Sequence, residues 1–499
     1  QHQAIESAGF DDLAGQLKAR LSGGEHDFLG CIKGTQAPII ATEELLASMV
    51  LRARAAGVRG FIVSRGTGLS HGAILAKSFG LPAVRIPDLD ALRSFAGKQV
   101  LLDGDGGEVL IQPKEAELAA AREKPSLRRG RDRGLPGRLW LSVVDPGQLD
   151  RVDWTGVEGV GLYRTEALFM RHSQDFPGEQ EQVDTYRRLF EAAGPRPVVV
   201  RTADLGADKP VDHMSFGPQQ NPYLGLRAHR IFRFHPEILV TQVRAVLRAA
   251  VGDHRLHLMF PMLETLDQWY FVQRLLDQAA DDLRDEGAEF QTDFQRGVLV
   301  ETPSAAWSFD EFLEVIDFAS VGTNDLVQYF FAVERDTANV ADLYQPEHPV
   351  MLRLLKSLAE RASEADKALS VCGEMAAEPR LAPVLVGLGV EDLSVAQPQL
   401  PAVQAALSQH SAKDCRRLAA RCLSASSAWE VRQMLGIRQG RQTTPPGAKL
   451  PEGHAVDPVC GMVVHTEDAA FMQKAGGRRY YFCSARCMRQ FRRAGARSR

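Results

Sequence analysis

The chain has 499 residues, of which 44% are hydrophobic and 24% are charged, and its formal net charge is −4. This composition is typical of a soluble globular protein with roughly two to four domains. The small net charge excludes a bulk attraction to nucleic acid, and no apolar run is long enough for membrane insertion. The seven cysteines do not form a disulfide pattern, which favours the reducing cytoplasm. No signal peptide is visible, and the start at Gln1 leads us to expect a fragment or a processed product.

Residues 38–113 alternate short apolar runs with helical patterns, which predicts a compact α/β domain. Residues 1–37 precede its first strand and are interpreted as an N-terminal remnant. The domain is expected to contain a helix at 43–56, a second helix that begins at His71, and strands at 38–40, 60–63, 83–84, 100–102 and 109–111.

His71 follows a run of small residues, 66–70, and opens an amphipathic helix that ends at Gly80. The N–H groups at the start of a helix attract negative charge, so a histidine in this place is suited to carrying a phosphoryl group. A capping histidine or a core histidine is an equally good interpretation of this segment alone.

Eight strand-like runs alternate with helical patterns between residues 139 and 438. Eight βα units over about 300 residues predict a TIM barrel, although regular alternation is also compatible with an open doubly wound sheet. We interpret 114–138, which includes a run rich in Arg, Gly and Pro, and 439–454 as linkers. The predicted strands are 139–144, 159–164, 197–202, 256–261, 297–301, 317–321, 369–372 and 392–395.

Polar residues follow five of these strands at the point where each strand ends. Examples are Arg164 after the second strand, Arg201 after the third and Glu301 after the fifth. Barrel enzymes build their active sites at the C-terminal ends of the strands, so these groups are predicted to converge in one mouth. A single group of this kind can belong to a structural ion pair, but five strand ends are difficult to explain by structure alone.

The residue types in this mouth suit phosphoryl transfer. The guanidinium groups of Arg164, Arg201 and Arg335 can clamp a substrate that carries a phosphate and a carboxylate, because the planar fork binds both groups through two hydrogen bonds. Glu301 and Asp325 are oxygen ligands on neighbouring strands and suit a magnesium ion that also binds substrate phosphate. Charge neutralisation and positioning of this kind provide most of the catalysis in phosphoryl transfer.

Two further residues complete the candidate site. Asn324 can donate a hydrogen bond to the same phosphoryl oxygens. Cys372 stands at a strand end beside Gly373 and Glu374, which makes it a candidate proton donor. The alternative interpretation is a buried free cysteine that only packs.

Eight segments, including GVGLYRTEALFM, NPYLGLRAHRI, SVGTNDLVQYFFAVERD and CGEMAAEP, occur in the order that one family shows. Residues 38–400 resemble the phosphoenolpyruvate-utilising enzymes, and most closely enzyme I, the phosphoenolpyruvate–protein phosphotransferase of the bacterial sugar phosphotransferase system. The segments lie at 159–170, 201–210, 221–231, 259–262, 300–306, 320–336, 343–349 and 372–379.

The resemblance implies a role for each candidate residue. His71 is expected to be the phosphorylated histidine of a swivelling domain, and Cys372 is expected to protonate the enolate of pyruvate. The residues implied to bind phosphoenolpyruvate are Arg164, Arg201, Arg227, Asn324 and Arg335, and those implied to bind Mg²⁺ are Glu301 and Asp325. The resemblance further implies a small phosphocarrier protein as partner, a role in sugar transport, and a homodimer.

The chain departs from the family pattern around its histidine. The family has Arg three residues and Thr two residues upstream of the histidine, where this chain has Gly68 and Leu69, and Arg65 lies near enough to be a substitute. Enzyme I also carries a helical subdomain that docks its phosphocarrier, and the 70 residues before His71 are too few to hold it. We therefore expect either a fragment or a different phosphoryl acceptor. The same shortness leads us to expect that the chain does not belong to the dikinase and synthase branch of the family, whose members need an ATP-binding domain.

Residues 455–499 form a separate small module with three cysteines, Cys460, Cys483 and Cys487. The spacing of the last two, with a third upstream, suits zinc or copper, and His454, His465 or a water can complete the site. The alternative is three buried cysteines in a small hydrophobic fold. The segments DPVCGM and YYFCSARC are similar to those of the YHS domain, a metal-binding module.

Two functions follow from different classes of protein. The first is a magnesium-dependent phosphotransferase of the enzyme I type, with a tethered metal module. The second is a metal-responsive regulatory protein whose barrel binds phosphoenolpyruvate without turnover. An intact set of mutually dependent groups favours the phosphotransferase, because an idle site has no physical reason to keep them.

Overall fold

The structure is a computed structural model. It describes residues 37–86, 88–104, 106–122, 134–150, 152–171, 175–206, 219–252, 255–337 and 340–437, and, in the C-terminal module, 453–459, 463–467, 469, 471–475, 478–482, 484, 485, 487–489, 491 and 492. Residues 1–36 of the predicted N-terminal remnant, residues 123–133 and 439–452 of the predicted linkers, Cys460 and Cys483 lie outside the described residues.

The N-terminal domain contains all five strands expected from the sequence. Strands β1, β2 and β3 form a parallel sheet, and β4 pairs with β5 in an antiparallel ribbon. Helices α3 and α4 cover the parallel sheet through a core that includes Val50, Phe61 and Ala76. The elements are β1 (Ile39–Thr42), α3 (Ala47–Ala55), β2 (Gly60–Val63), α4 (His71–Ser78), β3 (Ala83–Arg85), η1 (Asp90–Phe95), β4 (Val100–Asp103) and β5 (Glu108–Ile111), followed by α5 (Glu115–Arg122).

Gly72 fixes the place of α4 in this domain. A Cβ atom at this position would lie 1.9 Å from the carbonyl oxygen of Leu45, just before α3. Only glycine permits such a close approach of the α4 backbone to Leu45. This packing positions the start of α4, and with it the neighbouring residue His71.

The second domain is a closed barrel of eight parallel strands, so the TIM barrel prediction is confirmed and the open sheet is excluded. Strand β13 pairs with β6 to close the barrel. The strand residues are mostly buried, as expected where side chains fill the interior on one face and helices cover the other. The strands are β6 (Arg138–Val143), β7 (Val160–Arg164), β8 (Val198–Arg201), β9 (Leu256–Phe260), β10 (Gln295–Val300), β11 (Phe318–Gly322), β12 (Ala368–Cys372) and β13 (Asp392–Ala396).

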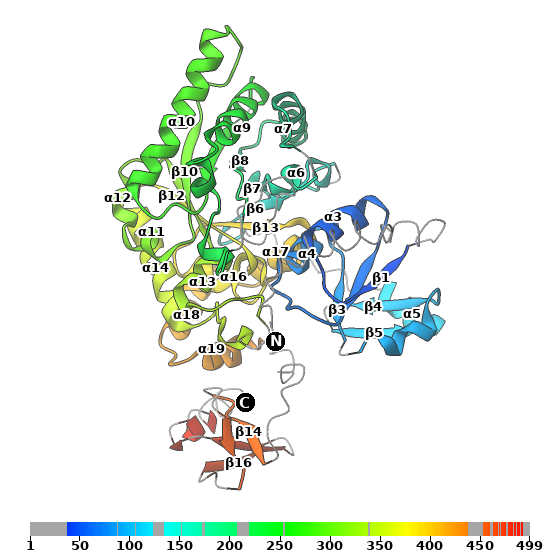
Figure 1. Cartoon of the computed structure of the whole chain (residues 1–499). Coiled ribbons are helices and arrows are strands. Elements are labelled where there is room, and N and C mark those ends of the chain that lie inside the picture. Colours follow the sequence, from blue (N-terminus) through cyan, green and yellow to red (C-terminus); the bar gives the residue numbers. More distant parts are fainter. Residues whose placement is uncertain are drawn as a thin grey trace.

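Helices surround the barrel (Figure 1). Its longer helices are amphipathic and bury one apolar stripe against the strands. They are α6 (Glu166–Phe169), α7 (Glu179–Ala193), α8 (His229–Phe232), α9 (Pro236–Ala249), α10 (Leu266–Asp285), α11 (Pro303–Trp307), α12 (Phe309–Leu313), α13 (Thr323–Phe331), α14 (Pro349–Glu364), α15 (Glu374–Ala377), α16 (Ala382–Gly387), α17 (Leu400–Ser408), α18 (Ala412–Leu423) and α19 (Ala428–Leu435). In the described part of the chain, no helix has the length and apolar character that crossing a bilayer requires.

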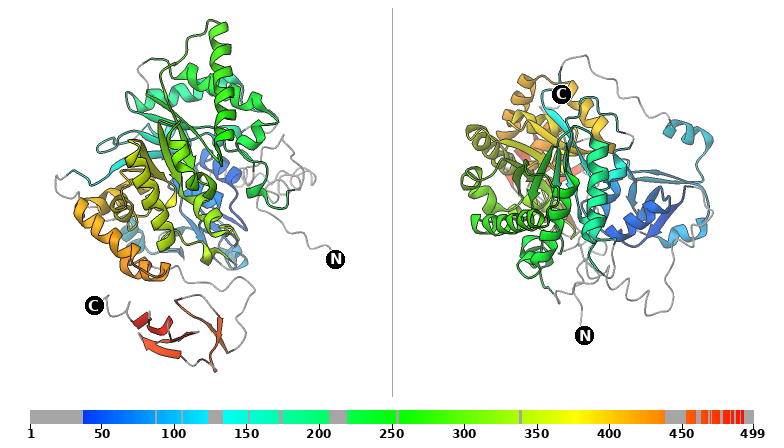
Figure 2. Two further views of the ribbon diagram at one scale, coloured as in Figure 1. Left: turned by 90° about the vertical axis from the view of Figure 1, so that its left-hand side faces the viewer. Right: turned by 90° about the horizontal axis from the view of Figure 1, so that it is seen from above.

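The N-terminal domain lies against the barrel, with α4 at the interface (Figures 1 and 2). The Thr67 hydroxyl donates to the carbonyl oxygen of Arg335 at 3.0 Å, and Gln148 Nε2 donates to the carbonyl oxygen of Ser78 at 2.9 Å. Lys77 pairs with Glu374. These few polar contacts bring the start of α4 to the C-terminal ends of the barrel strands.

The C-terminal module contains two antiparallel strand pairs. Strand β14 (His454–Val456) pairs with β15 (Val463–His465), and β16 (Phe471–Ala475) pairs with β17 (Arg478–Phe482). Phe491 packs against Tyr480 and Phe482, and it stacks on Trp429 of α19 at a centroid distance of 5.6 Å.

Candidate active site

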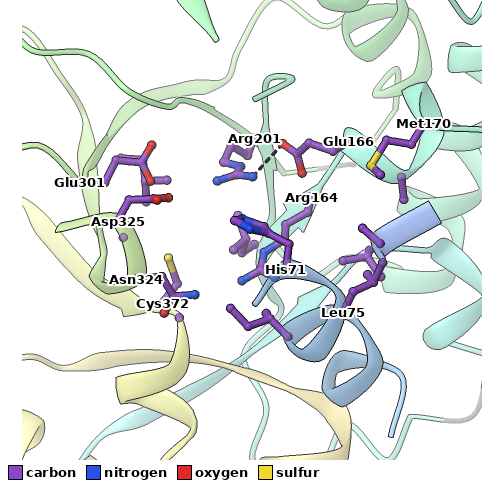
Figure 3. A pocket seen from close by; sticks show the side chains of 18 of the residues that line it. His71, Leu75, Arg164, Glu166, Met170, Arg201, Glu301, Asn324, Asp325 and Cys372 are labelled. Atoms are coloured by element: carbon purple, nitrogen blue, oxygen red, sulfur yellow. Dashed lines mark hydrogen bonds and ion pairs between the residues drawn. The ribbon is translucent and has the colours of Figure 1, made fainter. Parts of the chain in front are cut away.

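A pocket lies where the N-terminal domain meets the mouth of the barrel, and both domains line it. His71 reaches into it from α4, toward side chains that stand at the ends of several barrel strands (Figure 3). Of the predicted site residues, the pocket brings together His71, Arg164, Arg201, Glu301, Asn324, Asp325, Arg335 and Cys372. The predicted convergence at one mouth is therefore what the structure shows.

The helix that begins at His71 is present as predicted. The hydroxyl of Ser70 accepts a hydrogen bond from the N–H of Ala73 at 3.3 Å and caps the helix. His71 Nε2 lies 2.7 Å from Arg335 Nη2, a residue on the barrel. The histidine is thus already positioned in the barrel mouth.

Three guanidinium groups point to an anionic ligand. Arg201 pairs with Glu166 at 2.7 Å, but its buried Nε has no hydrogen-bond partner in the described part of the chain. The same holds for the buried Nε of Arg335. Arg164 makes no ion pair with any described carboxylate, and burial, followed by the charge of Arg201, lowers its pKa. Unsatisfied buried donors are costly, so this pocket favours a ligand with several acceptor oxygens.

Arg227 occupies a different place from the other arginines. It is fully buried and is not among the pocket-lining residues. Its guanidinium donates to both carboxylate oxygens of Asp204, at 2.7 and 2.8 Å, and to Asp325 at 2.9 Å. These bonds fix the carboxylate of Asp325, so the geometry gives Arg227 a supporting position beneath the pocket.

Glu301 and Asp325 are two buried carboxylates that line the same pocket. Burial, the charge of Asp325 and that of Asp204 raise the pKa of Glu301 to about 8. Burial opposes ionisation of Asp325 as well, but Arg227 and Arg335 hold its pKa well below the ordinary value. Mutual repulsion of this kind is relieved by a cation between the oxygens.

The carboxylate pair fits Mg²⁺ in a limited way. Among the described residues, no group of three or more His, Cys, Asp or Glu side chains could hold a metal ion. Mg²⁺ commonly binds through one or two carboxylates together with waters and substrate phosphate. Glu301 and Asp325 supply this smaller set.

Cys372 and Asn324 stand on the wall formed by β12 and the start of α13 (Figure 3). Cys372 is 3% exposed, and burial raises the pKa of its thiol. The Asn324 side-chain oxygen accepts from the N–H of Glu374 at 2.9 Å, so its NH₂ group is the end that can donate. A protonated thiol and an amide donor therefore face the same space.

Arg65 does not take the place of the missing arginine before His71. Its side chain is 72% exposed and lies 3.5 Å from Glu43. Sequence reasoning also gave no role to Tyr223 and Asp336, which contact His71. Both stand inside conspicuous segments, NPYLGLRAHRI and AVERD, and this was the one signal that could have indicated them.

The candidate metal site of the C-terminal module is described only in part. Cys487 is buried, with 7% exposure, whereas Cys460 and Cys483 lie outside the described residues. His454 and His465 are cross-strand neighbours whose ring centroids are 4.8 Å apart.

Three family models match the chain. The PEP-binding domain of PEP-utilising enzymes matches residues 137–412, the mobile domain of PEP-utilising enzymes matches 34–107, and the YHS domain matches 455–497. PEP is phosphoenolpyruvate.

The chain is 33% identical over 455 residues to multiphosphoryl transfer protein 2 of Escherichia coli (strain K12), covering 87% of this chain and 54% of that protein. It is 33% identical over 445 residues to the phosphoenolpyruvate-protein phosphotransferase of Staphylococcus carnosus (strain TM300), covering 86% of this chain and 77% of that protein. A protein of the same description from Staphylococcus aureus is 33% identical over 411 residues, covering 80% of this chain and 72% of that protein. The chain spans about half the length of the multiphosphoryl transfer proteins that it matches.

Proposed function

The chain belongs to the family of PEP-utilising enzymes, and from this premise we propose that it transfers the phosphoryl group of PEP to its own His71 and then to a small phosphocarrier protein, releasing pyruvate. The observation that carries the proposal is the pocket itself. His71 shares it with three guanidinium groups, two of which have buried donors without a partner among the described residues. A dianionic phosphate with a carboxylate nearby satisfies such donors.

In this proposal the domains divide the work. Residues 38–113 carry the phosphohistidine, 139–438 bind PEP, and 455–499 form a metal module. Arg164, Arg201 and Arg335 hold the phosphate and carboxylate of PEP, and Asn324 donates to a phosphoryl oxygen. Polar contacts such as the partly exposed Lys77–Glu374 pair help to hold the histidine domain against the barrel, and we infer that the domain leaves the barrel once phosphorylated.

Glu301 and Asp325 would hold Mg²⁺, which would neutralise charge on the substrate phosphate. After the bond from phosphorus to the enol oxygen breaks, the Cys372 thiol protonates C3 of the enolate and gives pyruvate. Arg227 holds Asp325 in place through its bond at 2.9 Å. The residues at this end of the barrel thus bind, orient and supply a proton.

We further propose a homodimer and a bound zinc or copper ion in a cytoplasmic protein that serves sugar uptake. Large apolar side chains on the barrel support the dimer: Trp307 is 89% exposed and Phe234 is 67% exposed. The match to the YHS domain and the buried thiol of Cys487 support a metal held with Cys460 and Cys483.

Incubation with ³²P-labelled PEP and Mg²⁺ tests the main proposal. We expect an acid-labile label on the wild-type chain and none on His71→Ala, because a phosphoramidate forms only at this ring. Label should then pass to a small phosphocarrier protein from the same cell. An unlabelled wild-type chain, or label that survives His71→Ala, would refute the proposal. If His71 is labelled but passes its label to an acceptor other than a small phosphocarrier protein, only the carrier step is refuted.

The raised pKa of Glu301 predicts a pH-dependent metal affinity. Since a carboxyl group must lose its proton to bind Mg²⁺ and the pKa of Glu301 is raised to about 8, affinity should fall as the pH drops below that value. The expected loss is about tenfold per pH unit between about pH 8 and about pH 6. Titration with Mn²⁺, followed by electron paramagnetic resonance, measures the affinity. Glu301→Gln should bind weakly with a flat pH profile, and an equally steep profile in this variant would contradict the assignment.

A further inference from the structure

Two side chains outside the proposed PEP clamp contact His71 from the barrel. The Tyr223 ring stacks on the imidazole at a centroid distance of 6.2 Å and an interplanar angle of 26°. Asp336 Oδ2 lies 3.9 Å from His71 Nδ1. The Tyr223 hydroxyl donates a hydrogen bond to the same Asp336 oxygen. The three residues therefore form one contact group.

The barrel holds Tyr223 firmly. The Tyr329 hydroxyl donates to the backbone carbonyl of Tyr223 at 2.7 Å, and the buried Arg227 donates to that hydroxyl at 3.1 Å. The guanidinium carbon of Arg335 also lies over the Tyr223 ring, 5.9 Å from the ring centroid. The Asp336 side chain is 12% exposed. A carboxylate placed in this way acts on the ring above it without much screening by solvent.

The contacts around the imidazole assign its proton. Arg335 Nη2 lies 2.7 Å from Nε2 and 3.3 Å from Nδ1, and a guanidinium can only donate. Since this one donor lies within reach of both ring nitrogens, the Asp336 carboxylate on the Nδ1 side decides between them. It favours the proton of the neutral ring on Nδ1, and Nε2 then presents its lone pair. Nε2 is therefore the nucleophilic nitrogen.

We propose that Tyr223 and Asp336 are positioning residues that set the ring plane and the tautomer of His71 for phosphoryl transfer, a role that rests on the function proposed above. In the step itself, the Nε2 lone pair forms a bond to phosphorus while the bond to the enol oxygen breaks, and that oxygen keeps the electron pair. Nδ1 retains its proton, so the ring becomes positively charged, and the Asp336 carboxylate stabilises this charge.

The chain just before His71 supplies little that is polar to the imidazole. Positions 68 and 69 are Gly68 and Leu69, neither of which has a polar side chain. Arg65 points away toward Glu43. Groups that orient the imidazole are therefore supplied by the barrel, and they act only while α4 is docked.

The test compares Asp336→Ala, Asp336→Asn and Tyr223→Phe in the full chain, with the exposed Asp342→Ala as a matched control. Nitrogen-15 NMR of labelled histidine, with His71→Ala to identify the signal, reports the tautomer without any turnover. Rapid-quench labelling with ³²P-PEP reports the rate of phosphorylation and the KM for PEP.

We expect a pure Nδ1–H tautomer in the wild type and a mixture in Asp336→Ala. Phosphorylation should slow on the order of tenfold with little change in KM. Asp336→Asn keeps an acceptor oxygen, so it should restore the Nδ1–H tautomer but only part of the phosphorylation rate. Tyr223→Phe should keep the ring stacking and lower the phosphorylation rate a few-fold. Wild-type tautomer and rate in Asp336→Ala would overturn the inference. An unlabelled wild-type chain would instead refute the proposed function, and the NMR result would still decide the role of Asp336.

Discussion

Replacing Arg335 by methionine is expected to lower the rate of phosphorylation by PEP by a factor on the order of 10³, the effect typical of a guanidinium that stabilises a transferring phosphoryl group. Arg335 is 1% exposed, its Nε has no partner in the described part of the chain, and its Nη1 lies 3.4 Å from Asp325. It contacts both the histidine proposed to accept the group and a proposed ligand of the metal. Methionine keeps much of its volume and removes both contacts.

Arg65→Met is the matched control for this substitution. Arg65 stands close to His71 in the sequence, but its side chain is 72% exposed and directed to Glu43. We expect less than a twofold change in rate, since exposed ion pairs contribute little. Rapid-quench labelling measures both variants, and circular dichroism checks their folding. A folded Arg335→Met variant within tenfold of the wild-type rate would contradict a direct role in transfer.

The barrel could be predicted because its signal repeats. Short apolar runs bounded by polar residues recur eight times, and each predicted strand overlaps an observed one. The same regularity predicted the site, since the C-terminal ends of parallel strands must meet on one face. Arg164, Arg201 and Glu301 were found through their positions after strands, without any knowledge of the loops.

The remaining features depend on how loops and domains approach one another, which periodicity does not encode. Tyr223 and Asp336 are about a hundred residues apart in the chain, and only the closed barrel brings them to one ring. The burial of Arg227 between Asp204 and Asp325 follows from the same folding. The expectation that Arg65 replaces the arginine before His71 rested only on its closeness in sequence. The structure does not support it, because the Arg65 side chain is exposed.

Replacing Cys372 by alanine is expected to lower the steady-state rate of pyruvate formation by roughly 10² to 10⁴, the range for loss of a positioned general acid. The thiol is 3% exposed, and burial raises its pKa, so it remains protonated at neutral pH. It lies on the same pocket as His71, at the end of β12. Without the proposed donor, protonation of the enolate at C3 slows, and the return of the phosphoryl group to the enol oxygen competes with product formation.

A buried thiol elsewhere separates this chemical role from packing. Cys422 on α18 is fully buried, and Cys422→Ala removes the same atoms from a position that does not line the pocket. Both alanine variants should lose some stability, but only Cys372→Ala should lose pyruvate formation, measured with a coupled lactate dehydrogenase assay. In a single turnover, Cys372→Ala should still form some phosphohistidine, because the bond between nitrogen and phosphorus forms before the proton moves. Equal losses of pyruvate formation in the two variants would mean that Cys372 only fills space, and the proton would then have to come from another group in the pocket.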